Sequence, residues 1–234
     1  MKNTILDKTK LVNSVFSKVY KKYDLMNDIM SLGVHRIWKE KFIDWMCPHP
    51  NSKLIDVASG TGDIARLFSK QNNDTSQITC IEPNEEMFNL GKKNLGKLKN
   101  INWIKAQAEE LPVKDNVYDY YSISYGIRNV TDINKTLKEA YRVLKPGGRF
   151  MCLEFSKIDN ESLNFFYKQY SKTIPLIGKF IVGTSEPYEY LVKSIDQFIN
   201  QEELIELMKK HKFQKNSYRN FSNGIVSIHS GWKI

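Results

Sequence analysis

The sequence predicts a doubly wound α/β fold, and two observations carry this prediction. Between residues 53 and 155, short apolar runs that end in turn residues alternate with segments of helical periodicity. Such alternation is typical of a parallel sheet covered by helices on both faces. The last part of the chain adds two runs joined at Asn223-Gly224, a dipeptide typical of a hairpin. We therefore expect a mostly parallel sheet of seven strands.

The expected strands of the parallel part are short apolar segments: Lys53–Ala58, Gln77–Ile81, Ile101–Ala106, Val117–Tyr125 and Arg149–Phe155. Helices are expected to about Lys70, around Met87 to Leu95, and from Ile133 to Leu144, where Pro146-Gly147-Gly148 ends the helix. A further helix starts at Asn200, which has Glu203 three residues on. Two strands near 213–221 and 224–233 then complete the sheet.

Two helical segments stand outside the alternation. Residues 10–46 carry apolar residues at helical spacing and are closed by Pro48 and Pro50. Residues 160–198 are rich in aromatic residues, and we interpret them as a helical insertion over the site. We expect one domain over 1–234, made of an N-terminal helical cap at 1–50, a cofactor-binding core at 51–156, the insertion at 157–200, and a terminal helix and hairpin at 201–234.

Composition limits the class of protein. The 234 residues are 41% hydrophobic, which is enough for one sizeable core. Three separated cysteines match neither a disulfide framework nor a zinc site, so no metal is expected. No run approaches the roughly 18 apolar residues of a membrane span. We expect a cytoplasmic protein, and peripheral contact with the inner face of the membrane stays open. The net charge of +9 suits an anionic partner or a solvated lysine-rich surface.

A loop rich in glycine and acids, Asp56-Val57-Ala58-Ser59-Gly60-Thr61-Gly62-Asp63, joins the first expected strand to its helix. Glycines let the backbone approach a ligand closely. Glu82 follows Gly62 by 20 residues, at the end of the next strand, where a carboxylate can accept both ribose hydroxyls. Gly60, Gly62 and Ala65 also match a dinucleotide-binding pattern, so a nicotinamide-binding oxidoreductase is the competing interpretation.

Charge favours one of these interpretations. A pyrophosphate at this helix N-terminus would be repelled by Asp63 beside it and Asp56 below it. The same carboxylates suit the amino group and the sulfonium of S-adenosylmethionine, which are both cationic. Gln107-Ala108 follows the third strand, where the adenine lies in such a fold, and Ser124 ends the fourth. The sequence thus predicts the class I S-adenosylmethionine-dependent methyltransferase fold, with Asp56, Gly60 and Gly62 at the cofactor.

From Val15 to Lys233 the sequence resembles the C-methyltransferases that act on the quinol ring in ubiquinone and menaquinone biosynthesis. Two specific motifs carry the resemblance: 23–28 (Tyr-Asp-Leu-Met-Asn-Asp) with Ser31, Gly33, His35, Arg36, Trp38 and Lys39 after it, and 126–130 (Gly-Ile-Arg-Asn-Val). The motif at 141–149 is shared with many other methyltransferases, and the tail at 223–231 also matches. The resemblance implies S-adenosylmethionine contacts at Thr61, Glu82, Gln107, Ala108 and Ser124. Here Glu82 replaces the usual Asp, Gln107 the usual Asn or Asp, and Ser59 a frequent Gly.

The substrate that the resemblance implies is a polyprenylated quinol: a 2-methoxy-6-polyprenyl-1,4-benzoquinol, a demethylmenaquinol or both. A phenol that loses its proton spreads negative charge onto its ortho and para carbons, one of which can attack the methyl group. Arg128 is the candidate for stabilising that phenolate, and a structural ion pair is its alternative role. His35 and Glu154 are candidate proton acceptors. Histidine at 35 equally suits a residue that orders the N-terminal loop.

Tyr125, Asn129, Tyr188 and Tyr190 are candidate substrate-binding residues, although aromatic side chains at this density also suit a core. The stretch from Phe165 to Tyr190 is the candidate membrane contact. Alternatives are another small-molecule or RNA methyltransferase of the same fold, and a non-catalytic binding module. Nucleic acid is not an expected partner, because the basic residues form no cluster in the sequence. A homo-oligomer and a quinone-biosynthesis complex both stay open.

Overall fold

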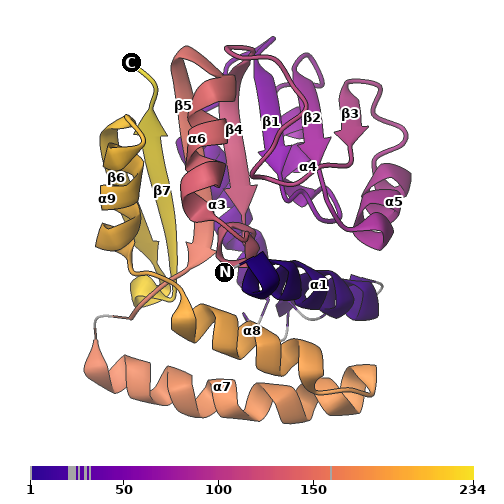
Figure 1. The fold of residues 1–234 in the computed structure, drawn as a ribbon, viewed down its shortest axis with the longest axis vertical. Helices are drawn as coiled ribbons and strands as arrows, with labels where there is room; N and C mark the ends of the chain where they lie inside the picture. The colour runs from indigo at the N-terminus through magenta and orange to yellow at the C-terminus, as the bar shows by residue number, and fades with distance from the viewer. Residues whose placement is uncertain (1, 21–24, 26, 29–30, 32, 159) are drawn as a thin grey trace.

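The structure of the protein is a computed structural model, and it describes residues 2–20, 25, 27–28, 31, 33–158 and 160–234. Its strands form one sheet in the order β3-β2-β1-β4-β5-β7-β6 (Figure 1). The strands are β1 (Lys53–Val57), β2 (Gln77–Ile81), β3 (Ile101–Ile104), β4 (Tyr118–Ser124), β5 (Leu144–Phe155), β6 (Gln214–Phe221) and β7 (Val226–Trp232). Strands β1 to β5 pair in parallel, whereas β7 runs antiparallel to β5 and to β6. This confirms the predicted seven-stranded, mostly parallel sheet.

The described helices cover both faces and one edge of this sheet. They are α1 (Lys2–Val19), α3 (His35–Met46), α4 (Asp63–Gln71), α5 (Glu85–Asn94), α6 (Ile133–Val143), α7 (Glu161–Val182), α8 (Glu186–Gln197) and α9 (Gln201–Lys210), with short 3₁₀ turns η2 (Ile127–Asn129) and η3 (Ser222–Gly224). Strand β1 shows why the sheet is covered on both sides. Leu54 packs into one core cluster with Phe42, and its neighbour Ile55 packs into the other with Leu137. Successive side chains of a strand point to opposite faces, so an uninterrupted apolar strand needs both faces covered.

Element ends differ from the sequence-based expectation, most clearly at three places. Helix α1 begins at Lys2 rather than near residue 10. Strand β5 begins at Leu144, because Leu144 already pairs with Tyr118 before regular pairing resumes at Arg149, and the intervening Pro-Gly-Gly forms an irregularity inside the strand. In the closing hairpin Phe221 pairs with Val226, so four residues form the turn rather than two.

The strand order reverses between β1 and β4, which places a crevice at their carboxyl ends. Three helices lie over that edge of the sheet: α1 runs across the ends of the strands, and the antiparallel pair α7 and α8 lies beyond it (Figure 1). Because α7 is the outermost layer, one of its sides has no described element against it (Figure 1). Helices α7 and α8 therefore lie over the carboxyl edge of the sheet (Figure 1).

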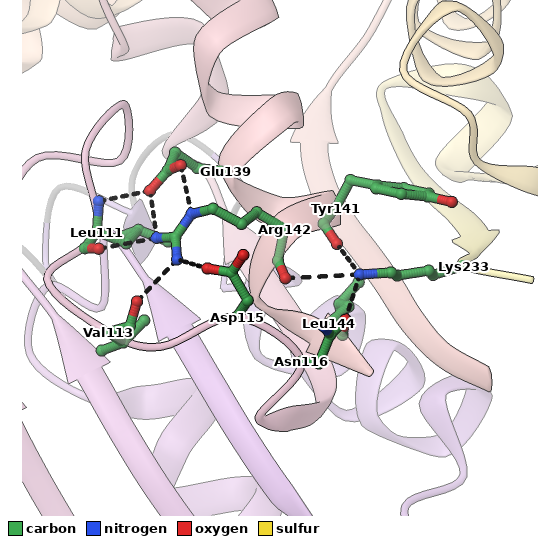
Figure 2. A network of polar contacts seen from close by, with 9 residues as sticks. All are labelled: Leu111, Val113, Asp115, Asn116, Glu139, Tyr141, Arg142, Leu144 and Lys233. Carbon is green, nitrogen blue, oxygen red and sulfur yellow. Dashed lines mark hydrogen bonds and ion pairs between the residues drawn. The ribbon is translucent and has the colours of Figure 1, made fainter. Parts of the chain in front are cut away.

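The long loop between β3 and β4 is fixed by one arginine of α6. Arg142 donates hydrogen bonds to the carbonyl oxygens of Leu111 and Val113, at 2.9 and 2.8 Å, and pairs with Glu139 and Asp115 (Figure 2). Glu139 in turn accepts from the backbone N–H of Leu111 at 2.8 Å. Because this loop also carries residues 107 and 108, the network holds one wall of the crevice in place.

Candidate active site

Two adjoining cavities lie at the carboxyl edge of the sheet. We call them the Glu82 cavity and the Asp56 cavity, and they share Ala58, Gly60, Ser124 and Tyr125. The Glu82 cavity is lined further by Phe16, Glu82, Gln107, Ala108 and Asn129, among others. The Asp56 cavity is lined further by Lys39, Asp56, Thr61 and Asp63, among others. All predicted cofactor contacts except Gly62 thus line one of two cavities that meet at the glycine loop.

Gly62 contributes through the backbone instead. It precedes α4 with φ 89°, a left-handed conformation that favours glycine, and a Cβ here would lie 2.5 Å from Leu95 Cδ1. Gly60 also has a positive φ, of 56°. Both glycines are therefore needed to bend the chain tightly from β1 into α4, which brings backbone rather than side chains to the cavity wall.

Glu82 is buried at the end of β2 and binds the glycine loop. Its two carboxylate oxygens accept the backbone N–H groups of Gly60 at 2.8 Å and Asn84 at 2.9 Å. Burial raises the pKa of Glu82 to about 7, although these two hydrogen bonds favour the ionised form. A carboxylate oxygen accepts more than one hydrogen bond, so Glu82 retains capacity for two hydroxyl donors in the cavity.

Asp56 is a buried carboxylate with one satisfied oxygen. Oδ1 accepts the hydroxyl of Ser122 at 2.6 Å, whereas Oδ2 has no hydrogen-bond partner among the described residues. Burial raises its pKa to about 7, and the bond from Ser122 opposes the rise. A buried acceptor without a partner costs free energy unless a ligand supplies a donor. Asp56 therefore fits the cationic amino group expected of the cofactor.

Asp63, the second acid of the loop, does not face the cavity as a lone carboxylate. Its Oδ2 lies 2.7 Å from Lys39 Nζ of α3, and its Oδ1 lies 3.3 Å from Arg66. Burial alone would raise its pKa, but the two cations hold the pKa of Asp63 below its usual value. The sequence-based argument that two uncompensated acids face the ligand is thus wrong for Asp63, because its cation comes from a helix 24 residues earlier.

Helix α1 covers the Glu82 cavity. The sequence predicted an N-terminal helical cap, but it did not identify the cavity that the cap covers. Val12, Asn13 and Phe16 line the cavity. Lys8 Nζ donates to the carbonyl oxygen of Val130 at 2.6 Å, and the Ser17 hydroxyl donates to a carboxylate oxygen of α5 at 2.8 Å. The only signal in the sequence was the amphipathic pattern of this segment, which identifies a covered face but not what it covers.

Arg128 and Glu154 lie together behind the cavity wall. Arg128 Nη1 is 2.6 Å from Glu154 and donates to the carbonyl oxygen of Tyr125 at 2.7 Å. Both side chains are buried, and burial raises the pKa of Glu154 despite its cationic partner. Arg128 therefore has the structural ion pair that was its alternative role, with a carboxylate of β5. Neither side chain is among the cavity-lining residues.

His35 is held near the N-terminal end of α3, outside the residues that line the two cavities. Its Nε2 lies 2.9 Å from Asp28 Oδ1, and burial lowers its pKa. This arrangement suits a histidine with a structural role, which ties the start of α3 to Asp28. Of the motif at 23–28, Tyr23, Asp24 and Met26 lie outside the described residues, as does Leu32.

The four candidate substrate contacts divide into two groups. Tyr125 and Asn129 line the Glu82 cavity, and Tyr190 donates its hydroxyl to Asn129 Oδ1 at 2.9 Å from outside it. Tyr188 instead has no exposed surface and packs against Gly178 of α7. The structure thus places Tyr188 in the core between α7 and α8, where the aromatic content of the insertion is used for packing.

Comparison with known proteins shows the family of this chain. The model of the ubiE/COQ5 methyltransferase family matches residues 3–233. The chain belongs to this family. A protein of Rickettsia bellii named ubiquinone/menaquinone biosynthesis C-methyltransferase UbiE is 52% identical, with 97% of this chain and 94% of that protein covered. A protein of Brucella abortus with the same name is 46% identical, with 97% and 87% covered.

Solved structures confirm the fold. A SAM-dependent methyltransferase of Thermotoga maritima has a TM-score of 0.66 at 20% identity, with 95% of this chain and 100% of that chain covered. One of Aquifex aeolicus has a TM-score of 0.67 at 16% identity, with 92% and 97% covered. The protein is an S-adenosylmethionine-dependent C-methyltransferase of the class I fold, as predicted, and the nicotinamide interpretation is set aside.

Cofactor affinity should depend on pH through the buried carboxylates. Glu82 must lose its proton to accept two ribose hydroxyls, so affinity for S-adenosylhomocysteine should fall as the pH drops below the pKa of about 7. Glu82→Gln should bind more weakly at neutral pH, by about 1–3 kcal/mol, and its affinity should vary less with pH, since only Asp56 then titrates. Calorimetry between about pH 5.5 and 7.5 measures both effects. Parallel pH profiles for the two proteins would contradict this placement of Glu82.

Proposed function

We propose that this enzyme transfers a methyl group to a ring carbon of a polyprenylated quinol: a methoxy-benzoquinol, a demethylmenaquinol or both. The observation that most supports the proposal is the match to relatives with the quinone-biosynthesis name over 96–97% of the chain, at 46–53% identity. The motif at 126–130, which carried the resemblance in the sequence, forms the turn η2 at the rim of the Glu82 cavity.

For this reaction the protein must orient the two reactants, stabilise negative charge on the ring and exclude water. The cofactor, when bound, supplies an electrophilic methyl group on a positively charged sulfur. The ring must carry negative charge to attack it, so a cation or donor near the phenol oxygen favours the reactive phenolate. Because the attack neutralises charge, a dry cavity that holds the two partners in line contributes much of the acceleration.

Arg128 is the residue we assign to the phenolate oxygen. Nη1 is engaged by Glu154 and by a backbone carbonyl, and Nε lies 3.4 Å from the Ser194 hydroxyl. Nη2 has no hydrogen-bond partner among the described residues. We assign this donor to a substrate whose phenol oxygen reaches past the lining residues Tyr125 and Asn129. Glu154 holds the guanidinium in place, and its raised pKa also makes it a proton acceptor. His35 stays the second candidate acceptor.

Asn129 supplies a second polar group at the same rim. Its Nδ2 donates to the carbonyl oxygen of Tyr125 at 3.2 Å, and its Oδ1 accepts from Tyr190. These two bonds fix the amide orientation and leave one N–H for the cavity that Asn129 lines. Tyr125 lies on the floor of both cavities. We assign both residues to the quinol ring.

The prenyl tail of the proposed substrate keeps that substrate in a membrane. Each buried methylene contributes roughly 0.8 kcal/mol, so a polyprenyl chain does not leave a bilayer freely. The outer face of α7, defined here by Phe165, Phe166, Leu176 and Phe180, is exposed, with Phe180 at 94%. Lys172 and Lys179 are exposed on the same helix. Among the described helices none is long and apolar enough to cross a bilayer. We propose that this face rests on an anionic membrane surface.

Methyl transfer to defined quinols tests the proposed reaction. We expect transfer from S-adenosylmethionine to a short-chain methoxy-benzoquinol or demethylmenaquinol kept reduced by dithionite, and none to the oxidised quinone, which cannot form a phenolate. Mass spectrometry should locate the new methyl on a ring carbon, because an O-methyl product would indicate a different reaction. Failure with both reduced quinols, despite measurable cofactor binding, would contradict the proposed substrate.

The role of Arg128 is separable from cofactor binding. Arg128→Ala should lower kcat by about 10²-fold, because its donor acts on charge that develops during the reaction. Affinity for S-adenosylhomocysteine should change little. Arg128→Ala with Glu154→Gln is the matched control, since it leaves no unpaired buried carboxylate. If the double variant regains near wild-type turnover, Arg128 serves only to neutralise Glu154.

Membrane contact should depend on charge and on the α7 face. The wild-type protein should bind phosphatidylglycerol liposomes at low ionic strength and dissociate as salt screens the attraction. Lys172→Glu with Lys179→Glu should weaken binding. The control variant is Lys97→Glu with Lys99→Glu, which changes the net charge by the same amount. Both lysines lie in the loop before β3, at the edge of the sheet opposite α7. This variant should bind the liposomes nearly as well as wild type. If the two variants lose liposome binding equally, the protein binds the membrane only through non-specific electrostatic attraction, and the α7 face has no special role.

A further inference from the structure

Lys39 stands at a position of α3 where a charged residue is unexpected. The buried residues of this helix recur at helical spacing: His35, Trp38, Lys39, Phe42, Ile43 and Met46. A lysine on such a face is costly unless its ammonium is paired. Its side chain is 7% exposed, and the Nζ atom lies 2.7 Å from Asp63 Oδ2. The helix therefore directs this one cation from its buried face toward the glycine loop.

The ammonium of Lys39 retains capacity for a further partner. It carries three N–H donors, and Asp63 is the one acceptor that it has among the described residues. Lys39 also lines the Asp56 cavity, together with Gly60, Thr61 and Tyr125. A desolvated ammonium with unused donors at a cavity wall is suited to bind an anionic group.

The cofactor brings such a group. Glu82, Gln107 and Ala108 accommodate the adenosine part in the Glu82 cavity, so the methionine part has the adjoining Asp56 cavity. That part is a zwitterion, with a carboxylate and an ammonium on one carbon atom. The Asp56 cavity carries the complementary pair: a cation at Lys39, and carboxylates at Asp56 and Asp63. The wall thus carries both signs of charge that a zwitterion needs, whereas two acids alone would repel its carboxylate.

We propose that Lys39 binds the carboxylate of the methionine moiety, while Asp56, whose Oδ2 has no partner among the described residues, takes its ammonium. Lys39 then sets the specificity for a cofactor that carries the amino-acid carboxylate. It also joins α3, and so the N-terminal segment, to the glycine loop through the bound ligand. The proposal rests on S-adenosylmethionine being the cofactor, and it is independent of the identity of the methyl acceptor.

Ligands that lack the carboxylate provide the test. Calorimetry would compare S-adenosylhomocysteine, decarboxylated S-adenosylmethionine and 5′-methylthioadenosine, which lacks the whole amino-acid part. Lys39→Met should lower affinity for S-adenosylhomocysteine by at least about tenfold, the loss expected for a charge-assisted hydrogen bond. Affinity for the two ligands without a carboxylate should stay within about twofold of wild type or improve, because these ligands have no group that Lys39 binds.

Arg66→Met is the matched control. Arg66 also pairs with Asp63, at 3.3 Å, but it is 57% exposed and is not among the residues that line the Asp56 cavity. It should leave all three affinities nearly unchanged. If Lys39→Met lowers the affinity for all three ligands equally, Lys39 is a structural residue. If it lowers none of the three affinities, Lys39 does not contact the carboxylate. Either result overturns the proposal. Lys39→Gln replaces Lys39→Met should the latter not fold, judged by thermal unfolding.

A wild-type protein that binds none of the three ligands would instead refute the cofactor assignment. That outcome is distinct, because it does not depend on any substitution. Failure of methyl transfer to quinols, by contrast, would leave these affinities and the role of Lys39 untouched.

Discussion

Two carboxylates, Asp56 and Glu82, are held out of water at the carboxyl ends of neighbouring parallel strands, and the free-energy cost of their burial has to be offset. The glycine loop offsets part of it for Glu82, through the N–H of Gly60. Ser122, in the adjacent strand, does the same for Asp56. Both pKa values nevertheless stay near 7, so neither acid is fully stabilised by the protein itself. The remainder is left for a ligand with hydroxyl and ammonium donors, which is what makes this edge of the sheet a binding site.

Cations reach this edge from elements outside the parallel core. Lys39 comes from α3 and pairs with Asp63. Lys8 comes from α1 and donates to the backbone carbonyl of Val130, just after η2. Arg128 lies in η2 itself and pairs with Glu154. Each tie also fixes a covering element onto the sheet. Electrostatic pairing and closure of the site are therefore achieved by the same contacts, since a covering helix that moved away would expose an unpaired charge.

The insertion serves two physical roles on opposite sides of one helix pair. The inner side packs against the rest of the protein. Tyr188 fits against Gly178, and a side chain at position 178 would overlap the tyrosine ring. Tyr190, on α8, reaches the rim of the Glu82 cavity through Asn129. Its outer side carries Phe165, Phe166 and Phe180 in solvent. If that side meets a bilayer, the path from the membrane to the cavity crosses α7 and α8, and the hydrogen bond of Tyr190 with Asn129 joins α8 to the cavity.

The sequence by itself determined the sheet, the glycine loop and the acid at Glu82, because these depend on local signals: strand patterning, turn residues and the spacing of a motif along one βαβ unit. It also identified Arg128 and His35 as notable residues through the motifs that contain them. Tertiary structure alone decided which residues of the site pair or pack with one another. Lys39 neutralises Asp63 across 24 residues, Glu154 engages Arg128 across 26, and Tyr188 is buried against α7. An ion pair or a packing contact between distant segments leaves no periodicity in the chain. It exists only once the sheet has brought the segments together, and for that reason the charge balance of the site was decided by the fold.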